Sequence, residues 1–175
     1  MKSIVQTKAL SLLLALAMLL SLVPIASLTA YATDPTNLST DMTAWTTGKY
    51  QVPAGGLTYS AAITVSGDVT LILTDETTLA ANKGITIGDG ATLTIQGNGT
   101  LTANGSNGKD KNYWSDGTTG NNGTAAIGGN GTIILTSGNL NATGGNGGSM
   151  SGGHGTGAKA GAGGTAIICA MIFKI

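Results

Sequence analysis

The chain contains no arginine and has few charged or aromatic residues. Its eight basic residues are all lysines, they are balanced by eight acidic residues, and the formal net charge is zero. Charged residues make up 9% of the chain and aromatic residues 4%. A basic surface for nucleic acid or an anionic membrane is therefore not expected. The missing guanidinium groups also disfavour bidentate recognition of phosphates and of acidic sugars.

Cysteine and histidine occur once each, as Cys169 and His154. A single cysteine excludes an intrachain disulfide, and Cys169 has no histidine or asparagine partner at a catalytic spacing. His154 stands in a glycine-rich stretch without a group to orient it, so no general base is expected there. Neither a phosphate-binding glycine–lysine–threonine motif nor an acidic calcium repeat follows the glycine runs. The sequence therefore predicts no cofactor, no metal site and no catalytic residue.

The first 32 residues resemble an export signal. Lys2 and Lys8 precede an apolar run at residues 9–23, and Ala30 and Ala32 supply the small side chains at positions −3 and −1 for cleavage before Thr33. The run is shorter than the roughly 20 residues that a membrane-spanning helix needs. We therefore predict a cleaved signal peptide at 1–32, a secreted protein located extracellularly at the cell surface, and no membrane partner after cleavage. An uncleaved N-terminal anchor is the alternative.

An internal repeat predicts the fold. Residues 63–84 align without a gap to residues 85–106, with eight of 22 positions identical. Each repeat contains three short runs in which apolar and polar residues alternate, and turn residues separate these runs. Stacking equivalent runs in parallel would bury the apolar face, as in repeat proteins. The expected fold is an all-β, single-stranded parallel β-helix (a solenoid) with about 22 residues per coil, and with Leu71, Leu93 and Ile133 stacked inside it.

The repeat also suggests how the chain is organised. Its pattern resumes after two glycine-rich insertions, which we expect to be loops that leave and rejoin the coil at equivalent points. The final segment lacks the glycine, threonine and asparagine of the repeats, and therefore reads as an aberrant or truncated tail. The predicted parts are the signal peptide (1–32), an N-terminal cap region (33–62), β-helix repeats (63–167) with insertions at 105–124 and 144–164, and the tail (168–175).

Acidic and amide side chains fall mainly in the predicted turns, where they bond to local backbone. In a uniform 22-residue register, Asp75 and Glu76 face a glycine and an asparagine of the next coil. Neighbouring coils therefore do not present the pair of acids that glycoside hydrolysis requires. Asn82 and Asn104 align between coils, and we expect them to form a structural ladder of amide hydrogen bonds.

The best candidate for binding is the first insertion. It concentrates the two aromatic residues Tyr113 and Trp114 beside Asp110 and Asp116, in a chain poor in both classes. Exposed aromatic rings stack on sugar faces, and carboxylates accept hydrogen bonds from sugar hydroxyls. These four residues are the expected carbohydrate-binding site. The alternative is that the two rings fold back and anchor the insertion.

Residues 63–71, 83–87, 97–103 and 125–130 carry a resemblance to a known group of proteins. They resemble the β-helical repeat segments of large cell-surface proteins of Gram-positive, clostridia-like bacteria, often labelled carbohydrate-binding domain-containing proteins. The resemblance covers residues 45–167. It implies that the chain is part of a larger protein, and that its partner is a polysaccharide or the cell wall. The absence of arginine favours a neutral polysaccharide over an acidic one.

The sequence thus favours a secreted or cell-surface structural or adhesive β-solenoid module that binds carbohydrate and catalyses no reaction. Two alternatives stay open. One is a β-helix enzyme that degrades polysaccharide as a lyase or glycosidase. The other is a non-functional truncated fragment of a larger surface protein.

Overall fold

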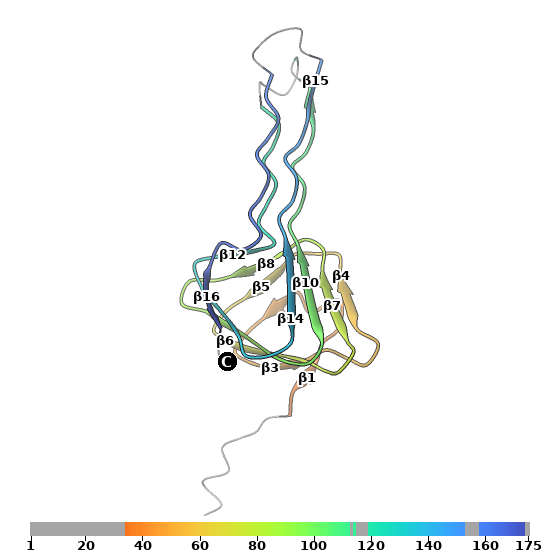
Figure 1. Ribbon diagram of the computed structural model, residues 1–175, viewed down its shortest axis with the longest axis vertical. Coiled ribbons are helices and arrows are strands. Elements are labelled where there is room, and N and C mark those ends of the chain that lie inside the picture. The colour runs from red at the N-terminus through yellow and green to blue at the C-terminus, as the bar shows by residue number, and fades with distance from the viewer. Residues whose placement is uncertain (1–33, 113, 115–118, 153–157, 174–175) are drawn as a thin grey trace, which may run out of the picture. The chain divides into compact units, whose positions relative to one another are not determined.

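The computed structural model describes residues 34–112, 114, 119–152 and 158–173 (Figure 1). The predicted signal peptide lies outside these residues. Residues 34–175 cluster as one unit. Within its described part the regular structure is almost entirely β, and the strands pair in parallel, as expected for an all-β chain.

Three sheets surround the interior. The six-stranded sheet contains, in spatial order, β1 (Thr36–Asn37), β3 (Gly48–Gln51), β6 (Asp68–Leu73), β9 (Thr92–Gly97), β13 (Thr132–Leu135) and β16 (Ala170–Phe173). The β12 sheet contains β2 (Ala44–Trp45), β5 (Ile63–Val65), β8 (Ile85–Ile87) and β12 (Ile127–Gly129). The β14 sheet contains β4 (Leu57–Tyr59), β7 (Thr78–Ala81), β10 (Thr100–Asn104) and β14 (Asn139–Thr143). A two-stranded sheet joins β11 (Lys111–Asn112) to β15 (Met150–Ser151).

The chain passes through the three larger sheets in a fixed rotation. It runs through β5, β6 and β7 of the β12, six-stranded and β14 sheets, and then through β8, β9 and β10 of the same sheets. Each strand therefore lies beside the equivalent strand of the next passage and points the same way. We call these three sheets and the turns between them the body.

Alternating side chains fill the interior of the body. The burial pattern of β6 alternates between exposed or half-buried and buried positions, and that of β10 does the same. The inward side chains of the central strands are almost completely excluded from solvent; they include Ile63, Leu71, Leu79, Ile85, Leu93, Ile95, Leu101 and Ile133. A two-residue period in sequence thus becomes one continuous apolar core.

Aromatic residues close the N-terminal part of this core. Trp45 on β2 lies with its ring centroid 6.1 Å from that of Tyr50 and 6.1 Å from that of Tyr59. The Trp45 indole N–H donates to the Met42 carbonyl at 2.9 Å, and the Tyr59 hydroxyl donates to the Ser39 carbonyl at 2.8 Å. Burial raises the pKa of Tyr59. Residues 44–59, expected to belong to a cap, supply one strand to each of the three sheets.

The register of the stack differs from the uniform 22-residue period. Ile63 pairs with Ile85 and Thr78 with Thr100, each 22 residues apart. Between them, however, Leu71 pairs with Ile95, which is 24 residues away. The expected single row of Leu71, Leu93 and Ile133 is therefore wrong. Leu93 instead lies between Val69 and Ile133, although all three predicted residues are fully buried.

The turns explain this shift. At the first corner, two residues separate β5 from β6, but four separate the equivalent strands β8 and β9. At the next corner the order is reversed, because four residues separate β6 from β7 and only two separate β9 from β10. The two differences cancel over a full passage, so the flanking strands keep their register. Because a shift of two preserves the inward and outward alternation, an ungapped alignment gives the correct buried face and the wrong partner.

Candidate functional site

The two glycine-rich insertions form a projection from the body, which we call the spike (Figure 1). It consists of four extended segments: rod 1 (105–112), rod 2 (119–124), rod 3 (144–151) and rod 4 (158–164). Rods 1 and 3 run parallel to each other, with Lys111 paired to Met150. Rods 2 and 4 are also parallel, through a bridge between Thr119 and Lys159. The insertions project from the body as the expected loops do, and in addition their segments are hydrogen-bonded to one another.

Hydrogen bonds along the rods recur every third residue. In rod 1 the backbone N–H groups of Gly105, Gly108 and Lys111 donate to carbonyls at the end of β14 and in rod 3, at 2.8, 2.7 and 2.9 Å. In rod 3, Gly145 and Gly148 donate to rod 2 at 2.9 and 2.8 Å. A period of three is typical of polyproline II-type helices, which form no internal hydrogen bonds. The rods therefore satisfy their backbone groups through one another.

Glycine occupies most of the crowded positions in the rods. Gly145 and Gly148 are buried between the rods, although no large apolar side chain lies at these positions. A Cβ on Gly148 would collide with the Lys109 carbonyl of rod 1, and one on Gly161 with the Asn121 carbonyl of rod 2. Gly163 is different, because its Cβ would meet only the Gly145 carbonyl oxygen at 3.7 Å. As at the axis of collagen, only a residue without a side chain fits the inward positions.

Polar side chains add to the bonding between rods, and Thr124 of rod 2 accepts a hydrogen bond from the Ser106 N–H of rod 1 at 2.7 Å. The Asn107 and Asp110 side chains of rod 1 accept hydrogen bonds from the Asn146 and Ser149 N–H groups of rod 3, at 2.8 and 2.6 Å. Asn122 accepts one from the Ala162 N–H at 2.9 Å. Asp110, expected to contact sugar, thus binds the backbone of rod 3 through one carboxylate oxygen. The glycine spacing of three in all four rods is the sequence signal that would have revealed this arrangement.

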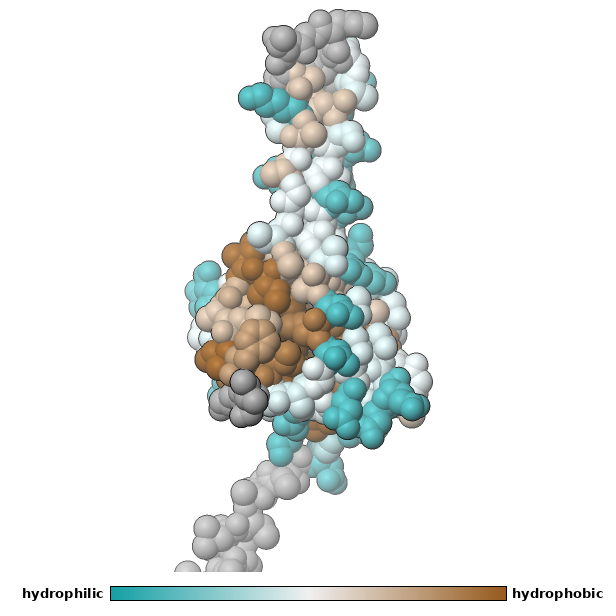
Figure 2. Space-filling view, in the orientation of Figure 1, coloured by the Kyte–Doolittle hydropathy of each residue, from teal (hydrophilic) through white to brown (hydrophobic). Residues whose placement is uncertain are grey.

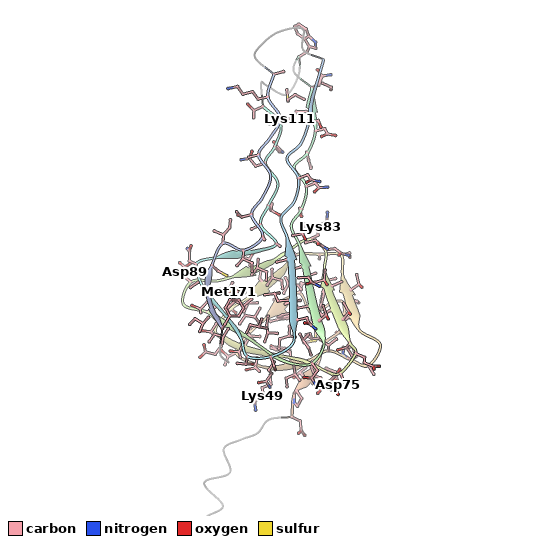
Figure 3. All side chains as sticks on the ribbon, viewed as in Figure 1. Lys49, Asp75, Lys83, Asp89, Lys111 and Met171 are labelled. Carbon is pink, nitrogen blue, oxygen red and sulfur yellow. The ribbon has the colours of Figure 1, made fainter. Side chains whose placement is uncertain are left out.

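The distal end of the spike carries Trp114. Its side chain is 72% exposed, and its backbone N–H donates to the Asn112 side chain at 3.0 Å. Gly152, after β15, lies beside the indole, since a Cβ there would be 3.1 Å from the Trp114 Cδ1 atom. The labelled Lys111 on rod 1 marks the approach to this end in Figure 3. Tyr113 and Asp116, the other two expected site residues, lie outside the described residues.

The outer surface of the β14 sheet is uncharged and regular, and we call it the threonine–asparagine face. Its residues are Thr58, Thr78, Ala80, Asn82, Thr100, Thr102, Asn104, Asn139, Asn141 and Thr143. The strands that carry them lie side by side in Figure 1, and this side of the body is white and teal in Figure 2. No member of the face is ionisable, so its only polar groups are hydroxyls and amides.

Amide side chains bridge successive passages of the chain. Asn104 donates to the Asn82 side chain at 3.4 Å, the contact expected for a ladder. Two further bonds of this kind were not expected from the sequence. Asn98 donates to Asp75 at 3.0 Å, and Asn130 donates to the Asp89 side chain at 2.8 Å. The carboxylates of these turns therefore bond to the next passage of the chain.

A groove of about 810 Å³ lies at the corner where β6 turns towards β7. Gln51, Ile72, Asp75 and Glu76 contribute to its walls. Of the described residues other than glycine, Glu76 alone has a positive φ, 60°. This corner also holds the two additional turn residues that accompany the shifted register of the six-stranded sheet.

Apolar side chains are exposed at the other end of the stack. Ile168, Ile172 and Phe173 are 56%, 45% and 64% exposed, and the six-stranded sheet ends there at β16. The brown patch of Figure 2 faces the viewer on this part of the body. Cys169 is half-buried beside it, and burial raises the pKa of its thiol. Residues 170–173, within the segment expected to be an aberrant tail, thus extend the six-stranded sheet by one strand.

Comparisons with protein-family models, with curated proteins and with solved structures found no match to the chain. Throughout the described ranges, no helix has the length and apolar character needed to cross a membrane. The same ranges contain no group of three or more histidine, cysteine, aspartate or glutamate residues placed to hold a metal ion. His154 lies outside them.

Proposed function

We propose that the chain is a secreted, cell-surface β-solenoid module with a structural and adhesive role, which attaches to neutral polysaccharide. The parallel register and the fixed rotation through three sheets support the solenoid, because stacked passages bury a face that one passage alone leaves exposed. The N-terminal segment with the pattern of an export signal supports secretion.

The exposure of Trp114 is the observation that carries the binding proposal. A large aromatic side chain that is 72% exposed at the end of a projecting structure has lost little of its contact with water. Burying its apolar surface against a partner would contribute a favourable free energy of about 25 cal/mol per Å². An indole ring also offers a flat surface for the apolar face of a sugar ring. Trp114 is therefore the anchor of the proposed site.

The spike supports a display function. At about 3.1 Å per residue, rod 1 extends roughly 25 Å, and the neighbouring rods brace it through backbone hydrogen bonds. A braced stalk holds its end in place before a ligand arrives, which lowers the entropic cost of binding. Asp110 then has a positioning role, because its bond to Ser149 joins rods 1 and 3 near the end of the spike.

Hydrogen-bonded carboxylates favour binding over catalysis. Asp75, Asp89 and Asp110 each give one oxygen to an asparagine or to backbone in a neighbouring passage or rod. A carboxylate held in this way joins two passages or two rods and so supports the fold. We therefore assign these acids a structural role and propose no catalytic activity.

Binding by the full chain to insoluble neutral polysaccharide tests this function. Trp114→Ala is expected to weaken pull-down on microcrystalline cellulose or chitin at least tenfold, with an unchanged far-UV circular dichroism spectrum. Trp114→Phe is the matched control, because it keeps an aromatic face and should retain most of the binding. If Trp114→Ala binds as well as the wild type, the end of the spike is not part of the binding site. If the wild type binds no glycan, only the structural role is left.

A further inference from the structure

The threonine–asparagine face repeats in two directions. Along the stack, Thr78 pairs with Thr100 and Thr100 with Asn139, and one row further Thr102 pairs with Asn141. Neighbouring parallel strands are about 4.8 Å apart, and outward residues of one strand follow each other at about 6.7 Å. Hydroxyls and amides, which both donate and accept hydrogen bonds, therefore stand on a lattice of nearly fixed spacing.

The hydroxyls of this face are available to a ligand. Some threonine hydroxyls elsewhere in the body bond to the chain itself: Thr77 donates to the Thr74 carbonyl and Thr136 to the Ile95 carbonyl, both at 2.7 Å. In the part of the chain that the structure describes, no such bond engages the hydroxyls of Thr100 and Thr102. Because threonine is branched at Cβ, its side chain also has little rotational freedom to lose on binding.

Charge distinguishes this face from the outer surface of the six-stranded sheet. That surface also carries threonines, but Lys49 and Asp68 lie among them, together with the apolar side chains of Ile72 and Ile134. Binding a neutral, hydroxyl-rich partner there would strip water from charged groups, which costs free energy. The uncharged face avoids that cost, so its composition matches a neutral partner.

The face continues into the spike. β10 ends at Asn104 and rod 1 begins at Gly105, while β14 ends at Thr143 and rod 3 begins at Gly144, without a turn between them. The Gly105 N–H donates to the Thr143 carbonyl at 2.8 Å, so hydrogen bonding passes from sheet to rods without interruption. In Figure 1 the β14 sheet and the spike lie along one line. One extended partner could therefore reach both.

We infer that the threonine–asparagine face is a second binding platform, which takes an ordered, extended neutral polysaccharide and shares it with Trp114. The inference rests on the proposed function and adds a second site to it. Repeating sugar hydroxyls meet repeating threonine hydroxyls and asparagine amides, and many weak contacts then act together. Once the polysaccharide is bound at one of the two sites, its binding to the other site is intramolecular, which raises the overall affinity.

A charge in the centre of the face tests this inference. In full-chain pull-downs on microcrystalline cellulose and on insoluble chitin, Thr102→Glu is expected to weaken adsorption at least tenfold. Thr94→Glu is the matched control, since Thr94 is an equally half-buried, outward-facing threonine of the same passage on the six-stranded sheet. It should stay within twofold of the wild type. Thr102→Val keeps the branched shape without the hydroxyl, and its adsorption should be roughly two- to tenfold weaker than that of the wild type.

Each outcome decides between the two sites. Loss in Thr102→Glu together with retention in Thr94→Glu supports the face, provided that both variants unfold at the same denaturant concentration. Unchanged adsorption of Thr102→Glu, with loss in Trp114→Ala, overturns the face and leaves the tip. Equal loss in both glutamate variants also overturns the inference. If the wild type adsorbs to neither polymer, the proposed glycan binding itself fails.

Discussion

The body and the spike are built from the same chain by opposite means. In the body, large side chains such as Leu93 and Ile95 alternate with polar residues and are fully buried. In the spike, buried positions such as Gly145 and Gly148 have no side chain, and backbone hydrogen bonds at every third residue join the rods. The body has a period of two and an apolar core, whereas the spike has a period of three and no core.

This difference separates two sources of order. Apolar burial is non-directional and grows with the area removed from water, so the body tolerates a shift of two residues in one sheet. The hydrogen bonds between rods are directional, so each rod needs its neighbours at a fixed distance. Substitutions that remove volume should therefore damage the body most, and substitutions that add volume should damage the spike most.

Loss of volume in the body is expected to have the largest effect. Leu93→Ala should lower the free energy of unfolding by about 2–5 kcal/mol, as truncations of buried leucine do, because Leu93 packs between Val69 and Ile133. Thr92→Ala, one residue away on the outer surface, is the control and should cost less than half as much. Denaturant unfolding measures both. Similar costs would contradict the separation of inner and outer faces.

Addition of one methyl group should open the spike and leave the body intact. In Gly148→Ala the new Cβ collides with the Lys109 carbonyl, whereas in Gly163→Ala it has room. A lysine-specific protease should cleave Gly148→Ala at Lys109, Lys111 or Lys159 at least tenfold faster than the wild type.

The control variant Gly163→Ala should be cleaved at the wild-type rate. Because both changes lie away from the apolar core, the free energy of unfolding of the body should change by less than about 0.5 kcal/mol in either variant. Wild-type cleavage of Gly148→Ala would show that the rods do not brace one another. A large loss of body stability would show that the two regions unfold together.

How well sequence reasoning worked also differs between the two regions. Alternation predicted the buried face of the body, including Leu71, Leu93 and Ile133, because burial depends only on which side a residue points to. It missed the partner of Leu71, since compensating turn lengths leave no trace in an ungapped repeat. In the spike, reasoning from composition predicted loops, because glycine is common in turns. The spacing of the glycines, rather than their number, carried the information.

Candidate residues show the same limit. The Asn82–Asn104 pair could be inferred, because those positions keep the 22-residue register. The Asp75–Asn98 and Asp89–Asn130 bonds connect turns of unequal length, so no fixed offset predicts them. The bond from Ser149 to Asp110 joins two insertions 39 residues apart, whose pairing depends on the rods. Contacts that keep the 22-residue register are thus legible in the sequence, and contacts that depend on unequal turns or on the pairing of the rods are not.

The smallest expected effect concerns the corner that shifts the register of the body. Glu76 has φ 60°, a left-handed conformation that asparagine adopts more readily than glutamate or glutamine. Glu76→Asn should therefore raise the free energy of unfolding by about 0.5 kcal/mol relative to Glu76→Gln, since sparsely populated backbone conformations cost of the order of 1 kcal/mol. Both variants remove the same charge, so the difference between their denaturant midpoints isolates the backbone. If Glu76→Gln is as stable as Glu76→Asn, the corner is not strained, and the two additional residues of this turn are accommodated without cost. A higher midpoint for Glu76→Asn would instead show that the body, like the spike, has a position where the local backbone conformation favours one residue type over another.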